Sequence, residues 1–172
     1  MAHIEQSDGI YLFGDIERGA HQAHIISYSD VCMAGLGFFF EHSCKGFQCP
    51  TPGNPPKDTI FFFEAQAVIL VVEATTCLPS VPACLLVYSD NSNTVDIFGS
   101  LCSLPPYNAL LKFTVSLLIK FNISLRVMHI PGVDNGVADA LSQFSNIQAS
   151  AACPGITIST FQPLQVASGA EK

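Results

Sequence analysis

Four acidic residues stand where their carboxylates could hold divalent cations: Asp30, Glu64, Asp90 and Asp139. Asp30 and Asp90 each close a segment with the pattern of a β-strand, and a ligand site in an open α/β sheet lies just beyond the ends of neighbouring strands. If those two strands are adjacent, the two carboxylates meet. Glu64 is expected one turn into a long helix and Asp139 on a later helix, from which both could face the same point.

Such a group of acids suits hydrolysis assisted by metal ions. Hard divalent cations need oxygen ligands. Two of them about 3.5–4 Å apart can activate a water on one side of a phosphodiester and stabilise the leaving oxygen on the other, with no need of a nucleophilic side chain.

The residues alone also allow a purely structural explanation, because Asp30 and Asp90 could be strand-end or capping residues. Asp139 could simply favour its helix N-terminus through the dipole. Glu64 fits such an explanation less well, since its apolar neighbours leave little polar stripe around it.

The segments that must position these acids alternate between strand-like and helix-like patterns. Strands are predicted over residues 24–31, 38–40, 45–48, 83–90 and 123–130. Gly35 and Gly37 predict a tight turn that joins the first two strands in an antiparallel pair. Helices are predicted over residues 59–77, 91–101, 105–121 and 137–144. This order predicts an α/β fold with a mixed five-stranded sheet flanked by helices.

Both ends of the chain lack a clear period. We interpret residues 1–22 as an N-terminal connector and residues 146–172 as a C-terminal linker or extension, which leaves 23–145 as the domain. The N-terminus does not have the pattern of a signal or transit peptide. The most apolar run, 60–72, is shorter than the ~20 residues that span a bilayer and contains Glu64 and Gln66. We therefore expect no membrane contact and an intracellular location, in the cytoplasm or nucleus.

Composition restricts the function further. The 172 residues are 49% hydrophobic and only 12% charged, which suits one folded domain. The net charge of −7 argues against a domain that grips nucleic acid through a basic surface, although carboxylates that bind cations are counted in it as bare charge. Seven cysteines without a CxxC pair fit a reducing compartment. His42, Cys44 and Cys49 lack a fourth zinc ligand at finger-like spacing. The absence of GxGxxG, Walker and GxSxG motifs weakens the alternative of a small-molecule α/β enzyme.

Four stretches resemble the ribonuclease H region of retroelement reverse transcriptases, in particular those of gypsy-like or DIRS-like elements of fungi. They are YSDVCMAGLGF, IFFFEAQAV, LLVYSDNSNTV and MHIPGVDNGVADALSQF, and together they cover roughly residues 24–144 in order and spacing. The family places its metal-binding acids after the first strand, early in the first helix, in a strand-end Asp-Asn pair and in a terminal Ala-Asp-x-Leu-Ser motif. In this chain these positions carry Asp30, Glu64, Asp90 and Asp139.

The resemblance implies a ribonuclease H-like fold in which those four acids are both the catalytic residues and the metal ligands. It implies a cofactor of two Mg²⁺ ions, with Mn²⁺ as an alternative. The implied reaction is hydrolysis of the RNA strand of an RNA–DNA hybrid, leaving a 3′-hydroxyl and a 5′-phosphate. The implied partners are that hybrid and the polymerase domain of the same polyprotein.

This chain departs from the family pattern in three ways. Gln143 stands where an arginine usually follows Leu-Ser, and the chain has no tryptophan. It also has no evident basic segment that could hold the hybrid, such as cellular ribonucleases H use. The alternative is therefore a catalytically inactive ribonuclease H-like module that packs against a polymerase or recombinase. The resemblance gives His129 no catalytic role, and we expect Asp134 to be a solvent-facing turn residue.

Overall fold

The computed structural model describes residues 23–51, 59–102 and 105–162. The predicted connector, residues 1–22, lies outside the described residues, as do residues 163–172 of the predicted extension. The strands are β1 (Ile25–Val31), β2 (Gly35–Phe40), β3 (Lys45–Pro50), β4 (Cys84–Ser89), β5 (Ser124–His129) and β6 (Thr157–Thr160). The α-helices are α1 (Thr59–Thr76), α2 (Ser92–Ser100), α3 (Asn108–Phe121), α4 (Gly136–Ser142) and α5 (Asn146–Ala152). Short 3₁₀ turns are η3 (Glu41–Ser43), η4 (Pro105–Tyr107) and η5 (Gly132–Asp134).

The strands form one mixed sheet in the order β5-β4-β1-β2-β3-β6. β1, β2 and β3 pair in antiparallel fashion, whereas β4 and β5 extend the sheet from β1 in parallel. The predicted mixed sheet flanked by helices is thus confirmed, and each of the five predicted strands is present. The predicted turn was misplaced, because Gly35 and Gly37 lie inside β2 and residues 32–34 link the first two strands instead. The strand count needs one correction, because β6 adds a sixth strand parallel to β3. It lies within residues 146–172, where the run Thr157–Thr160 is too short and too polar for its pattern to predict a strand.

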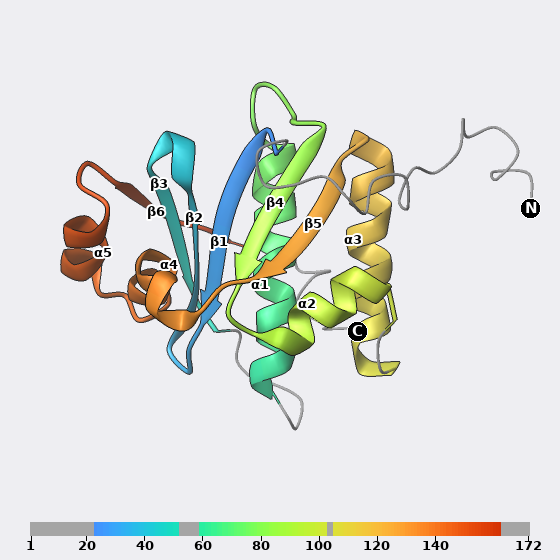
Figure 1. Ribbon diagram of the computed structural model, residues 1–172, viewed down its shortest axis with the longest axis horizontal. Coiled ribbons are helices and arrows are strands. Elements are labelled where there is room, and N and C mark those ends of the chain that lie inside the picture. Colours follow the sequence, from blue (N-terminus) through green and yellow to red (C-terminus); the bar gives the residue numbers. More distant parts are fainter. Residues whose placement is uncertain (1–22, 52–58, 103–104, 163–172) are drawn as a thin grey trace, which may run out of the picture.

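Helix α1 packs against one face of the sheet, and α3 packs beside α1 (Figure 1). Its residues Ala67 to Val72 are all buried, because α1 is covered by strands on one side and by α2 and α3 on others. From the sheet, Leu36, Phe38 and Phe40 join this main core. None of the helices in the described ranges is long and apolar enough to cross a membrane.

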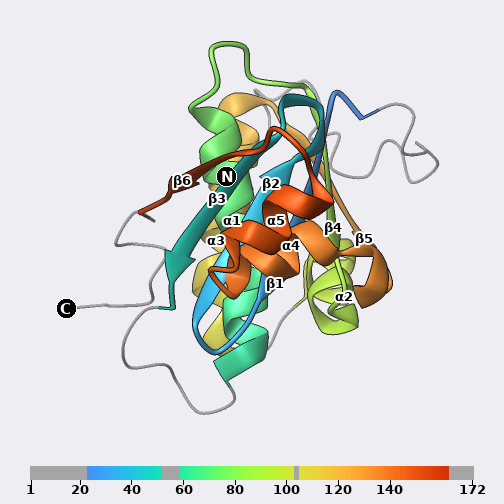
Figure 2. The ribbon, with the colours of Figure 1, turned by 90° about the vertical axis from the view of Figure 1, so that its left-hand side faces the viewer.

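Helix α4 packs against the opposite face, over β1, β2 and β3, and α5 follows it there (Figure 2). Phe39 points to this face because successive strand residues alternate between faces. It packs with Ala140, Leu141 and Ala149 in a second, smaller core. The C-terminal part of the chain therefore covers the side of the sheet that α1 leaves open.

Candidate metal centre

Two of the predicted acids are brought together by the parallel pairing of β1 with β4. The register matches Ser29 with Ser89, the residues that precede Asp30 and Asp90. The two aspartates therefore leave adjacent strands at the same edge of the sheet, as their strand-end positions predict. Asp90 also lies close to η5, because a Cβ added to Gly132 would be 3.2 Å from Asp90 Oδ2.

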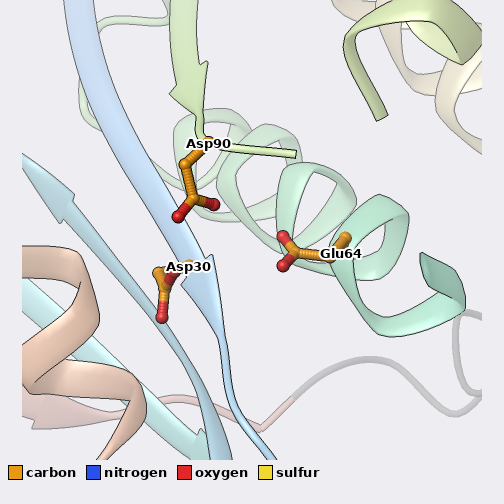
Figure 3. A group of neighbouring side chains, drawn as sticks. All are labelled: Asp30, Glu64 and Asp90. Carbon is orange, nitrogen blue, oxygen red and sulfur yellow. The ribbon is translucent and has the colours of Figure 1, made fainter. Parts of the chain in front are cut away.

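Glu64 reaches the same place from the second turn of α1. Figure 3 shows Glu64, on α1, and Asp90, after β4, directed toward Asp30 on β1. Each offers a carboxylate oxygen that lies within 4.8 Å of those of the other two. Asp30 and Glu64 are only 6% and 5% exposed, so this acidic cluster is largely withdrawn from water.

Burial and the negative charges of neighbouring acids make the charged forms of Asp30 and Glu64 unfavourable. Burial is the main cause that raises the pKa of Glu64 to about 8, and the negative charges of Asp30 and Asp90 add to it. Burial likewise raises the pKa of Asp30 to about 6, although a hydrogen bond from Ser142 opposes the change. Without a compensating positive charge, protons would have to neutralise part of the cluster.

The cluster fits a divalent cation on its chemistry. All its donor atoms are carboxylate oxygens, which are the ligands that Mg²⁺ and Mn²⁺ prefer. Glu64 Oε2 is buried and has no hydrogen-bond partner among the described residues. A buried acceptor without a partner is costly, and a bound cation would satisfy it. Asp30, Glu64 and Asp90 are thus the residues that could hold a metal ion.

Asp139 is not part of this cluster of three. It lies in the first turn of α4, and its Oδ1 accepts a hydrogen bond of 2.6 Å from Gln143 Nε2. It is nevertheless near enough for its negative charge to contribute to the raised pKa of Asp30. Its predicted role as a fourth ligand stays a prediction.

Two further residues that support the cluster were not singled out from the sequence. Ser142 Oγ donates a hydrogen bond of 2.7 Å to Asp30 Oδ2. Asn135, which is 1% exposed, donates from Nδ2 to the carbonyl oxygen of Ser29, 3.0 Å away. A signal for Ser142 was present, because it follows Asp139 by three residues and so shares its helix face.

The remaining candidates take ordinary positions. Asp134 is exposed in η5, which confirms it as a solvent-facing turn residue. His129 ends β5 and is exposed.

Comparisons with known proteins bear on the fold. No protein-family profile and no curated protein sequence matches the chain. Among solved structures, it is similar to RNase H1 of the halophilic archaeon Halobacterium salinarum, with a TM-score of 0.54 and 16% identity over 73% of this chain and 98% of that one. It is also similar to LC11-RNase H1 in complex with an RNA/DNA hybrid, with a TM-score of 0.52 and 16% identity over 68% and 92% of the two chains.

A third similar structure is the N-terminal RNase H domain of a Mycobacterium tuberculosis protein, with a TM-score of 0.50 and 13% identity over 75% of this chain and 99% of that one. The aligned region spans 92%, 98% and 99% of these three structures, so each matches this chain over almost its full length. The chain therefore has the ribonuclease H-like fold, as its sequence motifs imply.

Proposed function

We propose that this chain is a metal-dependent endoribonuclease that hydrolyses the RNA strand of RNA–DNA hybrids. The observation that carries the proposal is the convergence of Asp30, Glu64 and Asp90 at one edge of a ribonuclease H-like sheet. The fold alone admits many functions, so the site has to bear the argument. In this site three buried or half-buried carboxylates come from three separate elements, an arrangement that is unfavourable unless a cation or proton is present.

In this proposal Asp30, Glu64 and Asp90 hold Mg²⁺, with Mn²⁺ as an alternative, and Asp139 serves as a further ligand from α4. Two bound ions would polarise the scissile phosphate and activate a water for attack. The chain's own residues supply the oxygen ligands and hold them on rigid strands and helices. The withdrawal of Asp30 and Glu64 from water strengthens their attraction for a cation.

The choice of substrate draws support from the similar structures, one of which was determined in complex with an RNA/DNA hybrid. The retroelement part of the proposal rests on the sequence motifs: the chain would be the ribonuclease H module of a polyprotein, beside a polymerase domain. With only 7 Lys and Arg against 14 Asp and Glu, the chain itself offers little positive charge to phosphates. A partner domain that supplies such charge fits this composition.

One observation favours a second candidate, an inactive module with a structural or connector role. Asp139 is engaged by Gln143, the residue that replaces the arginine expected from the family pattern, and stands outside the cluster of three. A module of this kind would keep the fold and its packing surfaces without cutting the hybrid.

The deciding experiment is cleavage of a labelled RNA–DNA hybrid by the purified chain in Mg²⁺ or Mn²⁺. We expect hybrid-specific cleavage that EDTA abolishes, that leaves single-stranded RNA intact and that falls at least roughly 100-fold in Asp90→Asn. Asp134→Asn is the matched control, because it removes an exposed acid of the nearby turn and should leave the rate unchanged. A folded wild-type chain that does not cut with either metal would contradict a nuclease that is active on its own and favour the inactive module or a nuclease that requires its partner domain.

A further inference from the structure

The residue opposite Asp30 in the sheet is a glycine, and helix α4 uses the space that it leaves. In the β1–β2 register Asp30 pairs with Gly37, so their side-chain positions lie on the same face. A Cβ on Gly37 would stand 2.7 Å from both the Ala138 carbonyl oxygen and Leu141 Cβ. The backbone of α4 therefore lies directly on Gly37, closer than any other residue type would allow.

This close approach brings Ser142, the last residue of α4, to the carboxylate of Asp30. Ser142 is fully buried, and its Oγ donates to Asp30 Oδ2 over 2.7 Å. The same Oγ lies 2.9 Å from the carbonyl oxygen of Asp139, and the Ser142 carbonyl accepts a hydrogen bond from the Cys32 thiol. Residues 112 positions apart in sequence are thus joined inside the protein, beside the acidic cluster.

We propose that Ser142 is a positioning residue for the metal centre. Its hydroxyl holds one oxygen of Asp30, which fixes the orientation of the carboxylate and leaves the other oxygen for a cation shared with Glu64 and Asp90. Gly37 makes this hydrogen bond possible, because the backbone of α4 can lie directly against a residue that has no side chain. The proposal rests on the metal site of the proposed function, and it adds a residue that orients a ligand without touching the ion.

The expected effect is on metal affinity. Hydrogen-bond partners of metal ligands typically contribute 10- to 100-fold to affinity, because they hold the ligand in its binding orientation. A carboxylate freed from Ser142 would have to be ordered when the cation binds. A purely structural link between α4 and β1 would instead change the stability of the protein and leave the affinity for metal as it was.

The test is the binding of Mn²⁺ alone to the full chain, measured by isothermal titration calorimetry without nucleic acid. We expect Ser142→Ala to weaken Mn²⁺ binding roughly tenfold. Ser27→Ala is the matched control, because Ser27, in β1, is likewise a fully buried serine, and its Oγ donates to the Phe39 carbonyl, 2.9 Å away. It removes a comparable buried hydrogen bond from β1 but should leave Mn²⁺ affinity unchanged.

A second variant covers the case in which Ser142→Ala does not fold. Ser142→Cys keeps nearly the same volume and only a weak donor, so it preserves the packing of α4 while weakening the hydrogen bond. It should bind Mn²⁺ less tightly than wild type and more tightly than the alanine variant. Circular dichroism and thermal unfolding establish that each variant is folded before titration.

The outcomes separate the inference from the proposed function. Wild-type affinity in the folded Ser142 variants, or an equal loss in Ser27→Ala, would overturn the positioning role and leave the metal site intact. A wild-type chain that binds no Mn²⁺ would overturn both. A loss confined to the Ser142 variants supports the role of Ser142 whether or not the chain cuts a hybrid.

Discussion

Glu64 is the acid of this site whose negative charge is least favourable in the folded protein, because its carboxyl group is buried beside two other acids. In the absence of divalent cations, folded Glu64 keeps its proton up to about pH 8, whereas the unfolded chain releases it near the ordinary pKa of 4.5. The folded state therefore binds more protons between these two values, and its stability is lost as the pH rises. We expect the free energy of unfolding in EDTA to fall by roughly 2–3 kcal/mol between pH 6 and pH 8.

Glu64→Gln should remove most of this pH dependence, because it keeps the shape of the side chain without the titrating group. Urea unfolding of wild type and variant at pH 6, 7 and 8 measures the difference. Glu41→Gln provides the control, since Glu41 is an exposed acid of η3 away from the cluster. A wild-type chain whose stability is constant or rises over this range would contradict the buried, cation-free carboxyl group described for Glu64.

At this residue scale the sequence was informative about the acids and much less so about the residues that support them. Asp30 and Asp90 could be predicted to lie together because each stands at the C-terminal end of a strand-like segment, and adjacent parallel strands end at the same edge. The hydrogen bond from Ser142 to Asp30 could not be predicted, because it depends on how α4 is seated on Gly37. Such contacts are set by tertiary packing rather than by local pattern.

At the scale of elements, the close contact between α4 and β2 places Ser142 beside Asp30. Gly37→Ala would place a methyl group against Ala138 and Leu141, so we expect it to lower the free energy of unfolding by about 1–3 kcal/mol. Gly99→Ala, in α2, adds the same group where nothing lies within 4 Å, and should instead stabilise the protein by up to ~1 kcal/mol. Chemical denaturation of both variants tests this contrast. Equal effects of the two changes would show that α4 does not approach β2 this closely.

The elements themselves were largely predictable. Alternating or continuous apolar runs identified β1, β4 and β5, and α1 was recognised from its length although its burial on several sides removes any amphipathic pattern. The strand β6 was missed because Thr157–Thr160 is short and mostly polar, and only Ile158 is even half-buried. Its strand conformation comes from pairing with β3, which is a long-range interaction.

At the scale of the whole molecule, the fold supports binding of a nucleic-acid hybrid, whereas the net charge opposes it. The ribonuclease H-like sheet places the acidic cluster at its edge, while a net charge of −7 opposes the approach of a polyanionic hybrid. Divalent cations at the cluster would reduce this repulsion locally. A partner domain would be needed to offset the remaining repulsion between the chain and the hybrid. This agrees with the proposed place of the chain beside a polymerase.

The most direct test of the account is to locate Mn²⁺ in a crystal of the chain by its anomalous scattering. We predict a peak within ~2.5 Å of carboxylate oxygens from Asp30, Glu64 and Asp90. The peak should be absent from crystals of Asp90→Asn grown and soaked in the same way. Well-ordered wild-type carboxylates with no Mn²⁺ among them at saturating concentration would contradict the metal centre and, with it, the proposed nuclease.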